Sequence, residues 1–116
     1  MNKKEIFIKN IYKDINEISD IKMQNEYWLG KSNIYTSSYT ELMCRLFDED
    51  KFDLFVEVKA NEYGISENLI YHLEKLRNLL NNYVEKDRDD KIINDTEWRK
   101  VIAQATIIIE KWDINF

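Results

Sequence analysis

The chain has 116 residues and a net charge of −5 at neutral pH, with 44% hydrophobic and 13% aromatic positions. This length suits one domain with a single hydrophobic core, and the apolar content excludes a disordered chain. An acidic protein is repelled by nucleic-acid phosphates and by anionic membranes, so neither is an expected partner. We expect one domain over residues 1–116 and, from the charge, a basic partner.

The N-terminal residues lack the continuous apolar stretch of a secretion signal. No apolar run approaches the roughly 20 residues that a membrane-crossing helix needs. The single cysteine, Cys44, cannot form an intramolecular disulfide, which agrees with a reducing compartment. These features predict a cytoplasmic protein.

Proline is absent and glycine occurs only twice, so the strongest helix breakers are nearly missing and an all-α fold is expected. Residues 3–19 place apolar side chains at intervals of three and four, which predicts a helix whose polar face, including Glu17, is solvated. A shorter helix is expected over residues 21–29, ending at Gly30. Residues 30–37 are rich in turn formers and are expected to form a loop.

Ser38 and Glu41 fit a capping box, so a helix should begin there. The acids of residues 48–50 interrupt the apolar pattern, which predicts two short helices joined by a tight turn. Gly64 is a helix-terminating signal, and Ser66 is the expected N-cap of a long helix that reaches about residue 85.

Residues 86–91 are all charged and are expected to form a solvated connection. Asn94 to Glu97 is another capping signature, and the apolar stripe that follows predicts a final amphipathic helix. Trp98 and Trp112 lie on that stripe nearly four turns apart, so both should be buried. The patterns together predict an all-α compact bundle of about five to six helices with two long C-terminal ones.

No catalytic or metal-binding motif is recognisable. His72 and Cys44 lack the paired spacings that hold zinc, and no calcium-loop pattern occurs. Cys44 is expected to be a buried, inert thiol, and His72 is expected to pack at the border of an apolar face. We therefore expect no enzyme, no cofactor, no metal site and no catalytic residue.

The net charge is concentrated between residues 41 and 67, where eight acids and three bases sum to −5. Acids alternate there with phenylalanines, and protein interfaces use aromatic anchors and flanking charge for affinity and steering. The alternative is that Phe47, Phe52 and Phe55 belong to the core and the acids merely lie outside it. If the segment is an interface, the expected partner-binding residues are Asp48, Glu49, Asp50, Asp53 and Glu57.

Four segments carry a family resemblance: Ser37–Glu41, Leu46–Asp48, Phe52–Phe55 and the Asp95–Trp98 opening of the last helix. Their arrangement resembles small acidic immunity proteins encoded beside bacterial polymorphic toxins, including those of contact-dependent growth inhibition systems. The resemblance covers roughly residues 36–112 and consists mostly of structural motifs. It implies a cytosolic protein that neutralises one cognate toxin domain, often a basic nuclease, by covering its active or substrate-binding surface.

Two other functional classes stay open. A helical adaptor or regulatory subunit would bind a partner helix through an exposed hydrophobic groove. An enzyme would need a concave pocket with perturbed acids near His72.

Overall fold

The computed structural model describes residues 2–114, and every regular element in that range is helical. The elements are α1 (Lys3–Ser19), α2 (Ile21–Trp28), α3 (Tyr39–Cys44), η1 (Arg45–Glu49), α4 (Phe52–Leu54), η2 (Phe55–Lys59), α5 (Ala60–Glu62), α6 (Glu67–Asn82), α7 (Asp89–Ile93) and α8 (Thr96–Lys111), where η marks a π-helical turn. Because η1 continues α3 and η2 joins α4 to α5, the described residues form seven helices. The all-α prediction is confirmed, with slightly more helices than expected.

Side-chain caps begin most of these helices at the positions that the sequence indicates. The capping residues each accept a hydrogen bond from a backbone amide in the first turn of the next helix: Asn2, Asp20, Ser38, Ser66 and Asp95. Such a cap satisfies an amide that has no partner inside the helix and contributes about 1 kcal/mol.

Two helix boundaries differ from expectation. The helix α6 ends at Asn82, three residues early, and residues 89–91 of the expected connection form part of α7. Asp89 and Asp90 occupy the first turn of α7, where carboxylates interact favourably with the helix dipole. Ile92 and Ile93, at the end of the same helix, are buried in the core. The charged run therefore contains the first turn of a helix, and the apolar residues of that helix come only at its end.

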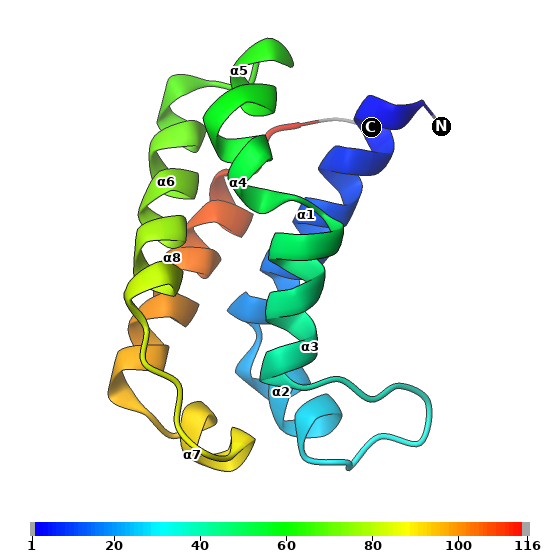
Figure 1. Ribbon diagram of the computed structural model, residues 1–116, viewed down its shortest axis with the longest axis vertical. Coiled ribbons are helices and arrows are strands. Elements are labelled where there is room, and N and C mark those ends of the chain that lie inside the picture. The colour runs from blue at the N-terminus through cyan, green and yellow to red at the C-terminus, as the bar shows by residue number, and fades with distance from the viewer. Residues whose placement is uncertain (1, 115–116) are drawn as a thin grey trace.

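The helix α8 packs along both α1 and α6. Figure 1 shows α3 on the opposite flank from α6, with α2 and α7 at one end of the bundle and α4 and α5 at the other. Within the described chain, no helix combines the length and apolar character needed to cross a bilayer.

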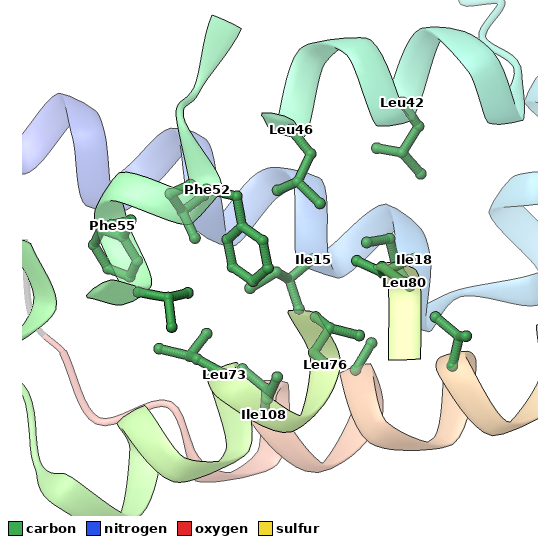
Figure 2. Packing of buried hydrophobic residues seen from close by; sticks show 14 of the residues in the cluster. Ile15, Ile18, Leu42, Leu46, Phe52, Phe55, Leu73, Leu76, Leu80 and Ile108 are labelled. Carbon is green, nitrogen blue, oxygen red and sulfur yellow. The ribbon is translucent and has the colours of Figure 1, made fainter. Parts of the chain in front are cut away.

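One cluster of buried apolar side chains joins the long helices. Figure 2 shows its centre, where α3, η1, α4, η2, α6 and α8 contribute Leu42, Leu46, Phe52, Phe55, Leu73, Leu76, Leu80 and Ile108, beside Ile15 and Ile18 of α1. Phe52 and Phe55 are fully buried, and Phe47 is partly buried against Phe52. The phenylalanines of the acidic segment therefore belong to the core.

The prediction for the two tryptophans of the last helix is confirmed for Trp98, which is fully buried. Trp112 is the C-cap residue of α8 and is only partly buried. Its ring lies against Tyr12, with 5.0 Å between the centroids. The apolar stripe therefore leaves the core at its last turn.

The expectation that Cys44 is buried is wrong, because its side chain is exposed. Leu42 and Leu46 lie one helical turn apart and both point into the core, which puts Cys44 on the opposite side of the helix. His72 is partly buried, and its Nδ1 lies 3.2 Å from Gln104 Nε2. This contact is in keeping with a packing role for the histidine.

Candidate functional site

Most of the acids predicted to bind a partner gather where η1 gives way to α4, and we call Asp48, Glu49, Asp50 and Asp53 the acidic elbow. The chain changes direction there at Lys51, whose φ of +53° lies in the left-handed region (Figure 1). Asp48, Glu49 and Asp53 are exposed, and none of them forms an ion pair with a residue that the structure describes. Their charges are therefore free to act on a partner.

Glu57, the fifth predicted residue, lies on η2 outside the elbow. Its Oε1 accepts a hydrogen bond from Arg77 Nη1 of α6 at 2.9 Å, while the Glu57 side chain stays 62% exposed. An exposed ion pair of this kind contributes little to stability. The pairing does offset the charge of Glu57, which makes it a weaker candidate than the elbow acids.

Asp50 belongs both to the elbow and to a groove of about 600 Å³ between α1 and η1. This volume falls within the roughly 300–1,000 Å³ that is typical of ligand pockets. Tyr27 of α2 and Tyr35 of the following loop also line it. The charged groups in the lining are Lys13, Asp14 and Glu17 from α1, and Arg45, Glu49 and Asp50 from η1 and the turn after it. Four acids against two bases make the lining negative.

Helical register brings these groups face to face. In α1, Asp14 and Glu17 are three positions apart and share one face. In η1, the amide of Asp50 bonds to the carbonyl of Arg45 at 2.7 Å, five positions back, which is the bond of a π-helix. An α-helix would bond residue 49 to that carbonyl instead. The wider turn therefore stacks Asp50 above Arg45 on the side facing α1.

Arg45 holds the two α1 carboxylates. Its Nε donates to Asp14 Oδ1 at 2.8 Å and its Nη2 donates to Glu17 Oε1 at 2.8 Å. Its Nη1 donates to the hydroxyl of Tyr35 at 3.0 Å. The side chains of Asp14 and Glu17 are only 3% and 6% exposed. The charge-assisted bonds from Arg45 therefore take the place of the hydrogen bonds that these groups would make to water. The expectation that Glu17 lies on a solvated face is therefore wrong.

A chain of hydrogen bonds connects the groove to the core. Glu17 Oε2 accepts from Trp28 Nε1 at 3.0 Å, and Gln24 Nε2 donates to the carbonyls of Glu17 and Ile18 at 2.9 and 2.8 Å. Gln24 Oε1 accepts from Trp98 Nε1 at 2.9 Å. A buried hydrogen-bond network whose members are satisfied favours a single arrangement of its side chains. This network therefore holds the side chains at the base of the groove in one arrangement.

The remaining carboxylate oxygen of Asp14, Oδ2, is buried and has no hydrogen-bond donor among the described residues. Asp50 lines the same groove as Asp14. Burial, and then Asp50, raise the pKa of Asp14 to about 8 against the lowering effect of Arg45. Asp14 therefore holds a proton at neutral pH and can share it with Asp50 through a hydrogen bond.

The shared proton should make the stability of the protein depend on pH. The pKa of Asp14 is higher in the folded chain, about 8, than its ordinary value of 3.8, so the folded state binds more protons between these values. The free energy of unfolding contributed by this group therefore falls as pH rises from about 4 to above 8. In Asp14→Asn, the amide donates permanently to Asp50 and its oxygen still accepts from Arg45, which removes this dependence.

Melting temperatures measured from about pH 5 to about pH 9 should decline by several degrees more in the wild type than in Asp14→Asn. Glu74→Gln is the control, because Glu74 is exposed on α6 and the change removes the same charge. It should follow the wild-type curve. Parallel curves for all three proteins would show that Asp14 holds no proton at neutral pH.

The sequence prediction missed Asp14, Glu17 and Arg45. A signal for Asp14 is present, because it lies three positions after Ile11 and four before Ile18 on the apolar stripe of α1. An acid on a core-facing stripe indicates a buried partner. The identity of that partner depends on how α1 meets η1, which no local pattern shows.

The arrangement is suited to binding a positively charged group. Among the described residues, no three His, Cys, Asp or Glu side chains are placed to hold a metal ion.

The chain matches no protein-family model, and no curated protein and no solved structure gives a match.

Proposed function

We propose that this chain is an immunity-type inhibitor, a cytoplasmic protein that binds a cognate bacterial toxin domain and neutralises it by protein–protein contact. A basic nuclease is the toxin class that its charge suits best. The observation that carries the proposal is the acidic elbow, with its unpaired exposed acids, standing beside a negatively lined groove.

The elbow is a rigid source of charge. Phe52 and Phe55 anchor it in the core, so the acids between and before them are held in place. A localised field of this kind steers an oppositely charged partner and raises its association rate. Carboxylates at fixed positions can also occupy the sites where a nuclease binds the phosphates of its substrate.

The surface next to the elbow offers apolar contact as well. Leu54 and Val58 lie four positions apart along α4 and η2 and are 40% and 41% exposed. Apolar residues surrounded by charge are the usual composition of a protein interface. Asp53 and Glu57 directly precede these two residues. Electrostatic attraction of a partner and apolar contact with it can therefore occur on one surface.

The alternative functions receive less support from the groove. A partner helix needs an uncharged apolar lining to bury its apolar face, whereas six of the residues that line this groove are charged. The enzyme alternative requires a perturbed acid near His72, but the described acid whose pKa is raised most is Asp14 on α1. His72 does not line that groove.

The proposal is tested by reversing the exposed charges of the elbow. Asp48→Lys, Glu49→Lys and Asp53→Lys together should slow association with the toxin domain encoded by the neighbouring gene by about tenfold or more at low salt, because steering is lost. The salt dependence of the association rate should fall as well. Stopped-flow or surface-based kinetics at two ionic strengths give both quantities.

The matched control reverses three exposed acids on other helices, Glu26→Lys, Glu74→Lys and Glu110→Lys, which changes the net charge by the same amount. It should slow association much less than the elbow variant. Equal slowing by the two variants would remove the elbow from the interface. A neighbouring gene product that does not bind the wild-type chain would contradict the proposed function itself.

A further inference from the structure

We propose that the groove between α1 and η1 binds an arginine side chain of the partner, with its guanidinium against Asp50 and Glu49 beside the ring of Tyr35. This inference rests on the proposed function and names the chemical group that the groove takes.

The charge balance inside the groove leaves room for one more cation. Arg45 is already committed to Asp14, Glu17 and the hydroxyl of Tyr35 through all three of its nitrogens. Of the other charged groups in the lining, Glu49 and Asp50 are negative and Lys13 alone is positive. An incoming cation therefore meets two carboxyl groups that Arg45 does not bind.

A second observation points to a missing positive partner. Asp14 is 2% exposed, lines the groove, and has a buried Oδ2 with no donor among the described residues. Asp50, which lines the same groove and raises the pKa of Asp14, is a carboxyl group as well. Two neighbouring acceptors are stabilised by either a proton or a nearby cation. The free protein can hold a proton there, and a guanidinium on the open side of Asp50 removes the need for it.

The shape of the site favours a guanidinium over a metal ion or a compact ammonium. The described residues supply no three-ligand cluster for a metal. A guanidinium is planar, binds carboxylates through a fork of donors and stacks on aromatic faces. Tyr35 is 42% exposed, its hydroxyl accepts from Arg45 at 3.0 Å, and its ring makes a T-shaped contact with Tyr27 with 4.8 Å between the centroids. The aromatic wall is therefore fixed before the ligand arrives.

Binding at this site should be linked to proton release. The guanidinium stabilises the ionised form of Asp14, so the proton of Asp14 leaves for the solvent when the cation binds. The charged groups that face the pair are Lys13 and Glu17 on α1 with Arg45 and Glu49 on η1. These four residues line the groove both with and without the bound guanidinium. Affinity should therefore increase with pH, by up to about tenfold per pH unit below the pKa of Asp14.

The probe is a blocked tripeptide, acetyl-Gly-Arg-Gly-amide, titrated into isotopically labelled protein and followed by nuclear magnetic resonance. The expected result is a saturable shift of the Glu49, Asp50 and Tyr35 amide signals. The carboxyl carbon of Asp14 should move towards its ionised position at neutral pH. The same peptide with citrulline, which has the shape of arginine but no charge, should produce neither change.

Variants separate the roles of the two carboxyl groups. Asp50→Asn should weaken binding of the arginine peptide at least tenfold. Asp14→Asn should still bind it but lose the dependence of affinity on pH. Glu74→Gln should behave as the wild type in both respects.

The absence of saturable shifts, or equal shifts with the citrulline peptide, would overturn the inference even if the variants fail to fold. That outcome would leave toxin capture by the elbow untouched, because the probe contains no toxin. Conversely, peptide binding without toxin binding would support the groove site while contradicting the proposed function.

Discussion

Replacing Arg45 with methionine should lower the free energy of unfolding by about 3–5 kcal/mol. The change leaves Asp14 and Glu17 buried in the wall of the groove without the donors that hold them at 2.8 Å. Removing Arg45 costs more than its ion pairs contribute, because the charge of Glu17 stays out of water and Asp14 Oδ1 loses its donor. Chemical denaturation monitored by circular dichroism measures the loss.

A compensated variant separates this explanation from simple loss of packing. Arg45→Met combined with Asp14→Asn and Glu17→Gln removes the uncompensated charge of Glu17 and the buried carboxyl group of Asp14 while keeping the side chains close to their original size. It should recover a large part of the lost stability. If the triple variant is as unstable as Arg45→Met alone, the arginine acts through its packing and the charge argument is wrong.

Replacing Trp98 with alanine should cost about 3–5 kcal/mol, the range for truncating a fully buried aromatic residue. The ring meets Trp28, Tyr39 and Tyr83 with centroid distances of 5.9, 5.5 and 5.2 Å. The substitution opens a cavity where four aromatic residues meet and also removes the donor to Gln24. Thermal and chemical denaturation should both show the loss.

Two controls divide the effect of Trp98→Ala into its parts. Trp98→Phe keeps much of the volume but leaves Gln24 Oε1 without its donor, so it should cost about 1–3 kcal/mol. Trp112→Ala should cost less than Trp98→Ala, because Trp112 is only partly buried. A melting temperature of Trp98→Ala equal to the wild-type value would contradict the packing of α8 described above.

The helices were largely predictable because their signals are local. The apolar spacing in α1 and α8 and the caps at Ser38 and Ser66 are read within a few residues, and the structure has them where the sequence predicts. The end of α6 was less predictable. Tyr83 donates its hydroxyl to Asp95 Oδ2 at 2.8 Å, and this contact across twelve positions ties the chain to the start of α8.

The candidate site was predictable only in part, for the same physical reason. Charge density along the sequence indicated the elbow, but it could not show that Asp50 faces Asp14 or that Arg77 pairs with Glu57. The contacts of Arg45 with α1 span 28 and 31 positions and depend on a π-helical turn. No recognised sequence signal specifies such a turn, so the groove became visible only in three dimensions.

Inhibition of the toxin's own activity tests the central claim most directly. The product of the neighbouring gene, which the proposed function takes to be the toxin domain, is assayed for nuclease activity while the chain is added in increasing amounts. The wild type and the Glu26, Glu74 and Glu110 reversal should each inhibit it completely near equal molar amounts. The Asp48, Glu49 and Asp53 reversal should inhibit it much more weakly. Undiminished nuclease activity in the presence of excess wild-type chain would contradict the account.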